Sequence, residues 1–270
     1  MADNPDPLTE GVRLNQHVVV FDLETVPCTE TLARLHGREA LTDDGAVEIL
    51  GEKFPKLPLH KVAVLAALVA ERVEGVWRVR SLGAPHIGDR SESDLISAFA
   101  ARVDSLRPTL VTFNGNGFDM PVLRYRAMVN GIAAPGLTSR PYFKRYDQAH
   151  VDLCDELASF QSNAKASLDD LCKMMGLPGK PEGIDGSKVW EHVRAGRIQE
   201  CANYGETDVV NTYRVWLRYE LFRGAITLEQ MAESEADLTA FITARLGERP
   251  HLAFLIQPQI AAPNATLDRA

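Results

Sequence analysis

The first strong hydrophobic run covers residues 18–21 and is followed directly by two acids with one apolar residue between them. Four apolar residues, three of them β-branched, are typical of a strand that is buried on both faces. Because side chains alternate across a strand, Asp22 and Glu24 are expected on one face and Leu23 on the other. We therefore predict a core strand with an acidic tip.

The rest of the pattern predicts a hairpin and then a series of helices and short strands. Residues 60–73 and 76–82 are rich in strand-forming residues, and Glu74 and Gly75 between them are typical of a tight turn. An antiparallel hairpin beside the first strand is therefore expected. Further along the chain, the pattern predicts strands over residues 106–113 and 150–153 and helices over residues 91–103, 118–130, 167–175, 188–194, 198–222 and 227–246.

The two acids after the first strand are candidates for binding a cation. Asp22 and Glu24 would repel each other on one face, and a divalent cation is the natural neutraliser of such a pair. The open alternative is that the strand has left the core at this point, so that both carboxylates are solvated. The pair alone does not choose between these interpretations.

Two further acids stand on separate predicted elements. Asp119 follows the turn-forming N-G-N-G segment at residues 114–117 and, taken alone, is typical of a helix cap. Tyr204 and Asp208 are four residues apart on the long helix and therefore share one face. If the first strand is central, Asp22, Glu24, Asp119 and Asp208 can converge at one edge of the sheet. A site for two metal ions could be assembled there.

The charge balance argues against a protein that coats nucleic acid. The net charge is -8, whereas contacts to phosphates need Lys and Arg. Residues 107–146 are an exception, because they contain six basic residues, one acid and six interleaved aromatic residues. Such a mixture suits a single nucleic-acid strand, whose bases can stack on aromatic rings. The alternative is that the aromatic residues belong to the core and the basic residues to a solvated face.

Composition excludes several other classes. The longest apolar run, residues 62–70, is too short to span a bilayer, and the N-terminus has neither a basic flank nor an apolar stretch. We expect no membrane partner and a cytoplasmic location. The cysteines form no C-x-x-C pair, so no zinc or redox site is predicted; reduced, half-buried thiols are expected at Cys28, Cys154, Cys172 and Cys201.

Three motifs in order make the chain similar to a known family. They are F-D-L-E-T at residues 21–25, F-N-G-N-G-F-D-M-P at residues 113–121 and Y-G-E-T-D at residues 204–208. With these motifs the chain resembles the DEDD 3′-5′ exonucleases, and more narrowly the predicted exonucleases related to the proofreading domain of family B DNA polymerases. The resemblance covers residues 17–223 and implies an α/β, RNase H-like fold with a mixed β-sheet flanked by helices. Tyr204 resembles the tyrosine of the DEDDy subclass.

The resemblance also implies roles for individual residues. Two ions, Mg²⁺ or Mn²⁺, would be held by Asp22, Glu24, Asp119 and Asp208, and Tyr204 would orient the attacking water. The implied reaction is hydrolysis of phosphodiester bonds from the 3′ end of nucleic acid, with single-stranded DNA favoured. The sequence does not distinguish DNA from RNA, because no residue can be assigned to a 2′-hydroxyl. The candidate substrate-binding residues, of which the two arginines come from the basic segment, are Thr25, Asn114, Phe118, Arg124 and Arg145.

Two alternative functions stay open at this point. Haloacid dehalogenase-type phosphatases also begin with a strand and a D-x-D-x-T motif, in which the first Asp is a nucleophile. Here Asp22 would be that nucleophile, with Asp169 and Asp170 as the later acidic motif, but no convincing Lys motif follows. A non-catalytic nucleic-acid-binding module of the same fold is the second alternative.

The predicted organisation has three parts. Residues 1–16 form a flexible leader, residues 17–223 the exonuclease domain, and residues 224–270 a helical extension with a mobile tail from residue 258. The length leaves no space for a polymerase domain after the third motif, so a stand-alone exonuclease is expected. The sequence assigns no role to the helix-leaning insertion between residues 28 and 60, and none to the extension.

Overall fold

A five-stranded mixed sheet forms the centre of the protein. The computed structural model describes residues 16–51, 54–180 and 186–256. The strand order is β3-β2-β1-β4-β5, with β2 antiparallel to its neighbours and β4 and β5 parallel to β1. This is the RNase H-like arrangement, so the predicted fold class is confirmed. The strands are β1 (His17–Pro27), β2 (His60–Val73), β3 (Val76–Gly83), β4 (Thr109–Thr112) and β5 (His150–Asp152).

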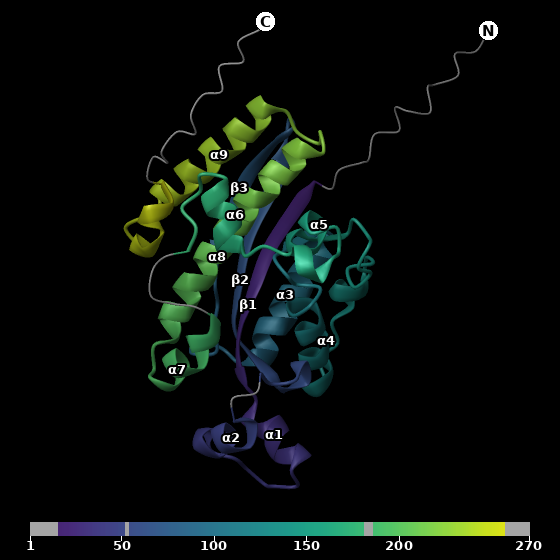
Figure 1. The fold of residues 1–270 in the computed structure, drawn as a ribbon, viewed down its shortest axis with the longest axis vertical. Coiled ribbons are helices and arrows are strands. Elements are labelled where there is room, and N and C mark those ends of the chain that lie inside the picture. The colour runs from purple at the N-terminus through teal and green to yellow at the C-terminus, as the bar shows by residue number, and fades with distance from the viewer. Residues whose placement is uncertain (1–15, 52–53, 181–185, 257–270) are drawn as a thin grey trace, which may run out of the picture.

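Helices cover both faces of the sheet, and alternation along β1 supplies both cores. Val18 and Val20 pack in the core beneath α8, whereas Val19 and Phe21 pack in the core shared with the helices of the opposite face. One face carries α6 (Leu168–Met174), α7 (Val189–Arg194), α8 (Ile198–Phe222) and α9 (Leu228–Thr243). The opposite face carries α3 (Glu92–Leu106) and α4 (Asp119–Val129), and α5 (Leu153–Leu157) follows β5 (Figure 1).

Side-chain caps and backbone conformation fix the ends of several elements. The hydroxyl of Ser91 caps α3 and that of Thr227 caps α9, each within a capping box. Asp152 caps α5 by accepting from the backbone N–H of Cys154. The strand predicted over residues 106–113 is shorter than expected. Arg107 adopts a left-handed conformation at the end of α3 and Pro108 follows it, so β4 begins only at Thr109.

The insertion after β1 folds into a small unit of its own. It contains α1 (Thr29–Leu35), α2 (Asp43–Leu50) and a 3-10 turn, η2 (Leu57–Leu59), which share the apolar residues Leu32, Ala46 and Leu59. Figure 1 shows α1 and α2 together beyond the end of β1, away from the two main helical layers. The predicted helical character of this segment is thus confirmed.

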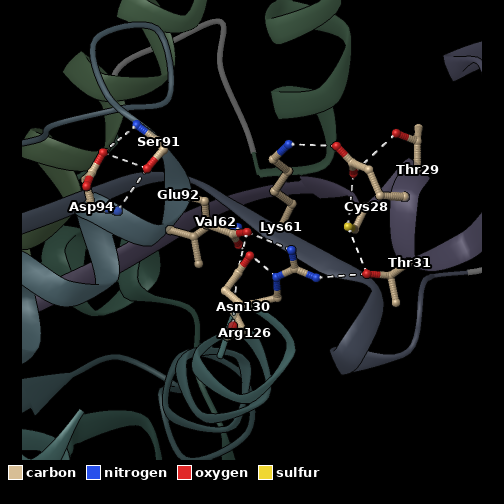
Figure 2. A network of polar contacts seen from close by, with 11 residues as sticks. Cys28, Thr29, Thr31, Lys61, Val62, Ser91, Glu92, Asp94, Arg126 and Asn130 are labelled. Carbon is tan, nitrogen blue, oxygen red and sulfur yellow. Dashed lines mark hydrogen bonds and ion pairs between the residues drawn. The ribbon is translucent and has the colours of Figure 1, made fainter. Parts of the chain in front are cut away.

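A buried ion pair fixes α4 to its neighbours. The guanidinium of Arg126 lies 2.6 Å from one carboxylate oxygen of Glu92 on α3 and 2.8 Å from the other (Figure 2). Glu92 also accepts from the backbone N–H of Val62 on β2 and from Asn130, while Arg126 donates to Thr31 of α1. Each partner is therefore satisfied, as a buried charge requires.

The last elements close one edge of the sheet. Ser234 and Asp237 of α9 accept hydrogen bonds from the outward N–H groups of Trp77 and Val79 on β3, at 3.0 and 2.7 Å. A final 3-10 segment, η6 (Pro250–Ile256), packs beside α8 and α9. The predicted leader, except for its last residue, and the predicted tail lie outside the described residues.

Two composition-based expectations can be compared with the structure. All four cysteines are free, and they are buried rather than half-buried. Among the residues with described structure, no helix is both long and apolar enough to cross a membrane.

Candidate active site

A cavity of about 1020 Å³ opens beside β1, just beyond the end of β4. The parallel pairing of β4 with β1 stops at Val20 opposite Val111, whereas β2 follows β1 as far as Pro27. One side of β1 is therefore released from the sheet where its acids begin. The predicted site residues that line this cavity are Asp22, Glu24, Thr25, Asn114, Phe118, Asp119, Tyr204 and Asp208.

The acids of β1 lie on the face predicted for them. Val18 and Val20 face α8, and the strand period carries Asp22 and Glu24 to the same side, while Leu23 packs in the opposite core. The expectation of an acidic strand tip is wrong, because β1 continues to Pro27. The carboxylates stand within the strand, so a paired backbone holds them rather than a loop.

Asp119 is attached directly to the backbone of β1. Its carboxylate accepts a 2.9 Å hydrogen bond from the N–H of Leu23, the residue between the two acids. Phe118 occupies the cap position of α4 and makes no side-chain cap bond, so the interpretation of Asp119 as a helix cap is wrong. Its carboxylate is used to join α4 to the strand.

Helix α8 brings the third motif against the sheet. Tyr204 and Asp208 are one turn apart and both buried, as their spacing predicts for one helix face. Gly205 allows this approach, because a Cβ there would lie 2.9 Å from the side chain of Ala66 on β2. One carboxylate oxygen of Asp208, Oδ1, is buried and has no hydrogen-bond partner.

The electrostatics of the cavity disfavour four ionised carboxylates. Burial raises the pKa of Asp22 and Glu24 well above the usual range, and repulsion from the neighbouring acids raises both further. Burial raises the pKa of Asp119 to about 7 and also raises that of Asp208. Burial and the nearby Asp208 raise the pKa of the Tyr204 phenol. The acids are therefore close enough to interact and lack full compensation by cations.

Lys180 is a functional candidate in the cavity that the motifs did not predict. Its ammonium lies 3.0 Å from Asp208, donates to the hydroxyl of Tyr204 and stands 4.8 Å from the centre of the Tyr204 ring. Its charge lowers the pKa of Asp22 and Glu24, against the larger effect of burial. The only sequence signal was a lone basic residue in a Gly- and Pro-rich loop, which does not reveal where the loop leads.

The donor atoms in the cavity suit hard divalent cations. Carboxylate oxygens are the ligands that Mg²⁺ and Mn²⁺ prefer, and the unpartnered Oδ1 of Asp208 is a free donor of this kind. Within the described ranges, however, no three His, Cys, Asp or Glu side chains are already arranged as a metal site. The carboxylates of the cavity therefore suit divalent cations by their chemistry. In the structure, the ammonium of Lys180 is the positive charge beside Asp208.

The predicted substrate-binding residues of the turn and strand also face the cavity. Asn114 has a left-handed backbone, at φ 70°, and its side chain accepts a 3.2 Å hydrogen bond from Lys165. Asp152 holds this turn by accepting from the backbone N–H groups of Asn114 and Asn116. The hydroxyl of Thr25 lies 2.9 Å from Nδ1 of His60.

The two predicted arginines stand outside the cavity lining. Arg145 pairs with the buried Asp155 at 3.0 Å, and the guanidinium of Arg124 lies 4.1 Å from the centre of the Phe143 ring. Other members of the basic segment have structural contacts, because Arg126 forms the buried pair with Glu92 and Tyr142 is fully buried. The segment is thus mixed, because the aromatic residues Tyr125 and Tyr146 are exposed whereas the basic Arg126 is buried. The alternative interpretation, with aromatic residues in the core and basic residues on a solvated face, does not describe the whole segment.

Comparison with known proteins gives one family. Residues 52–258 match the model of a family described as predicted 3′-5′ exonuclease related to the exonuclease domain of PolB. The match contains the second and third motifs, including Asp119, Tyr204 and Asp208, and begins after Asp22 and Glu24. No curated protein matches the chain.

Solved structures with a similar chain path include polymerases and exonucleases. The family B DNA polymerase of the archaeon Pyrobaculum calidifontis is 22% identical at a TM-score of 0.49, over 77% of this chain and 24% of the polymerase. E. coli exonuclease I in complex with a 5cy-dT13 oligonucleotide is 16% identical at a TM-score of 0.36, over 81% of this chain and 42% of exonuclease I. The chain therefore spans a quarter of the first protein and less than half of the second.

Proposed function

The chain belongs to the family of predicted 3′-5′ exonucleases related to the exonuclease domain of PolB, and we propose that it removes nucleotides from single-stranded 3′ ends by a two-metal-ion mechanism. The observation that carries this proposal is the group of four acids around one cavity, three of them buried and Asp22 half-buried, each with a raised pKa. A cluster of carboxylates with one nearby ammonium is costly to a fold, and such a cluster is retained where it binds or reacts. The residues are Asp22, Glu24, Asp119 and Asp208.

The four acids would hold the metal ions. When bound, two divalent ions would neutralise the phosphate and stabilise the entering and leaving oxygens of the displacement. Asp22 and Glu24 would act from a paired strand, Asp119 from a helix end attached to that strand, and Asp208 from α8. Because these elements belong to both helical layers, closure of the fold itself would assemble the ligands.

Tyr204 would position the attacking water. Its phenol keeps its proton at working pH, because burial and Asp208 raise its pKa above the usual value. A neutral hydroxyl can hold a water through a hydrogen bond without competing for the metal ions. This supports an orienting role rather than that of a general base.

The aromatic side chains of the cavity support a single-stranded substrate. Phe54 and Phe118 line the same cavity as the acids and offer faces on which unpaired bases can stack. A duplex end would have to fray before its terminal base reached them. We propose single-stranded DNA as the preferred substrate, with RNA as the comparison in the test.

The test is digestion of 3′- and 5′-labelled single-stranded DNA and RNA with Mg²⁺, Mn²⁺ or EDTA. Stepwise shortening from the 3′ end that EDTA abolishes is expected. Binding without shortening in Mn²⁺ would contradict the proposal in favour of a binding module. Release of phosphate alone, with a covalent adduct trapped on Asp22, would instead indicate the phosphatase chemistry.

A further inference from the structure

The insertion between β1 and β2 contributes an exposed aromatic ring to the cavity. Phe54 lies just before η2 and is 73% exposed. It nevertheless lines the cavity that holds the four acids. The family motifs assign this residue no role, since it lies between the first motif and the hairpin.

Two other rings hold Phe54 in place. The ring centres of Phe54 and His60 are 4.9 Å apart, and those of Phe54 and Phe118 are 6.0 Å apart. His60 meets Phe118 nearly edge-on, with ring centres 5.0 Å apart and planes at 85°. We call these three rings the aromatic wall. Phe54 contributes the exposed part of it, while His60 is buried.

The polar atoms of the aromatic wall are already used. Nδ1 of His60 lies 2.9 Å from the Thr25 hydroxyl, and Nε2 lies 3.0 Å from the carbonyl oxygen of Pro55. Donation from Nε2–H to that carbonyl leaves Nδ1 to accept from Thr25, so neither nitrogen remains for a ligand. The wall therefore offers a ligand π-faces but no hydrogen bond from His60.

The aromatic wall is connected to the acids through one residue. Thr25 follows Glu24 in β1 and contacts His60, which in turn packs on Phe54 and Phe118. A ligand with a phosphate at the acids would thus have its flat ring beside Phe54. A nucleotide has this combination of an anionic end and a flat apolar face.

We propose that Phe54, held by His60 and Phe118, is the stacking platform for the unpaired 3′-terminal base, and that it binds the four bases alike. The proposal rests on the exonuclease function proposed above and adds a specificity: the enzyme needs an unstacked base but does not read its identity. Base stacking on an aromatic ring tolerates any sequence, because every base has a π-face. The insertion of unknown role thereby becomes part of the substrate site.

The test is binding of a single-stranded DNA oligonucleotide whose 3′-terminal base is 2-aminopurine, a base whose fluorescence falls on stacking. The Asp22→Asn variant serves as background in Mg²⁺, so that the oligonucleotide stays intact under the proposed function. Phe54→Ala in this background should weaken binding about tenfold and abolish the quenching. Phe54→Tyr should keep both, and Phe222→Ala is the matched control, because Phe222 is 84% exposed and lies at the end of α8.

Two further comparisons, one with an abasic 3′ end and one among the four natural 3′-terminal bases, sharpen the result. An oligonucleotide that ends in an abasic nucleotide should bind the background about tenfold more weakly, with no further loss from Phe54→Ala. Phe54→Ala should weaken the binding of oligonucleotides that end in each of the four natural bases by the same factor. Unchanged binding and quenching in Phe54→Ala, or a loss confined to one base, would overturn this inference while leaving the exonuclease proposal intact. A wild-type protein that neither binds nor shortens the oligonucleotides would overturn both.

Discussion

Glu92 and the acids of the cavity differ in how far their charge is compensated. Glu92 is surrounded by donors, since Arg126, Asn130 and the N–H of Val62 all reach its carboxylate (Figure 2). The acids of the cavity instead repel one another, and Lys180 is the cation that acts on Asp22, Glu24 and Asp208. The first arrangement stabilises the fold, whereas the second leaves charge available for a ligand. Whether donors and cations balance the charge of an acid therefore distinguishes structural from functional acids better than its burial does.

The largest effect is expected from removing a cavity acid. Asp208→Asn should reduce exonuclease activity about a thousandfold or more, because a group that would stabilise the transition state is lost. Its free energy of unfolding should not fall, because a repelling charge has been removed. Initial rates on a 3′-labelled oligonucleotide and urea unfolding measure the two effects. Asp104→Asn, at an exposed position on α3, is the control, and wild-type activity in Asp208→Asn would contradict the site assignment.

The opposite result is expected for the Glu92 network. Arg126→Met leaves the Glu92 carboxylate buried without its ion-pair partner and should lower the free energy of unfolding by about 3–5 kcal/mol. The activity of the remaining folded protein should change little, because Arg126 lies two turns along α4 from Asp119. The double variant Glu92→Leu with Arg126→Met should recover part of the stability. Loss of activity without loss of stability would reverse the comparison.

The pH dependence of stability should reveal the uncompensated acids when metal is removed. An acid whose pKa is raised in the folded state contributes stability below its unfolded pKa, and this contribution is lost as pH rises through the folded pKa. For Asp119 this loss of stability is expected between pH 3.8 and about 7. The raised pKa values of Asp22, Glu24 and Asp208 act in the same direction, although the charge of Lys180 lowers these pKa values in part.

Urea unfolding in EDTA should therefore show stability falling across this range as pH rises. Mg²⁺ should restore stability at neutral pH, because an ion that binds only the folded state stabilises it. The Asp119→Asn variant should show a shallower pH dependence in EDTA. An identical slope in the variant and the wild type would contradict the assignment of this titration to the cavity.

A smaller effect is expected from removing the ammonium group of Lys180, which lies beside the acids. Lys180→Met should bind Mn²⁺ several-fold more tightly, because its ammonium now neutralises the acids that would hold the ions. Calorimetric titration with Mn²⁺ measures this without any substrate. Lys173→Met is the matched control, since Lys173 pairs with Asp169 on its own helix at the surface. Weaker Mn²⁺ binding in Lys180→Met would show that the lysine helps to form the site rather than compete for it.

The smallest effect is expected at the surface. Arg124→Glu should weaken binding of a single strand modestly and lower the slope of log affinity against log salt by about one, as for one lost phosphate contact. Anisotropy titrations at several salt concentrations measure the slope. An unchanged slope would show that Arg124 does not bind the substrate.

Much of the fold followed from local patterns, because the hairpin and the long helix depend on neighbouring residues. The alternation in β1 likewise predicted that Asp22 and Glu24 share one face and that Leu23 lies on the other, where Leu23 packs in the opposite core. Contacts distant in sequence were not accessible. The bond from Leu23 to Asp119, the approach of Lys180 to Tyr204 and the pairing of Arg126 with Glu92 join residues whose proximity no local pattern encodes. Asp119 was open to the wrong interpretation for this reason.

The contact between α9 and β3 also restricts how this protein can associate. An edge strand normally offers free N–H groups on which another chain can add a strand. Here Ser234 and Asp237 occupy those of Trp77 and Val79, so an intruding strand would first have to peel α9 from the sheet. Removing α9 should therefore expose the edge of β3, on which a second copy of the chain could add a strand.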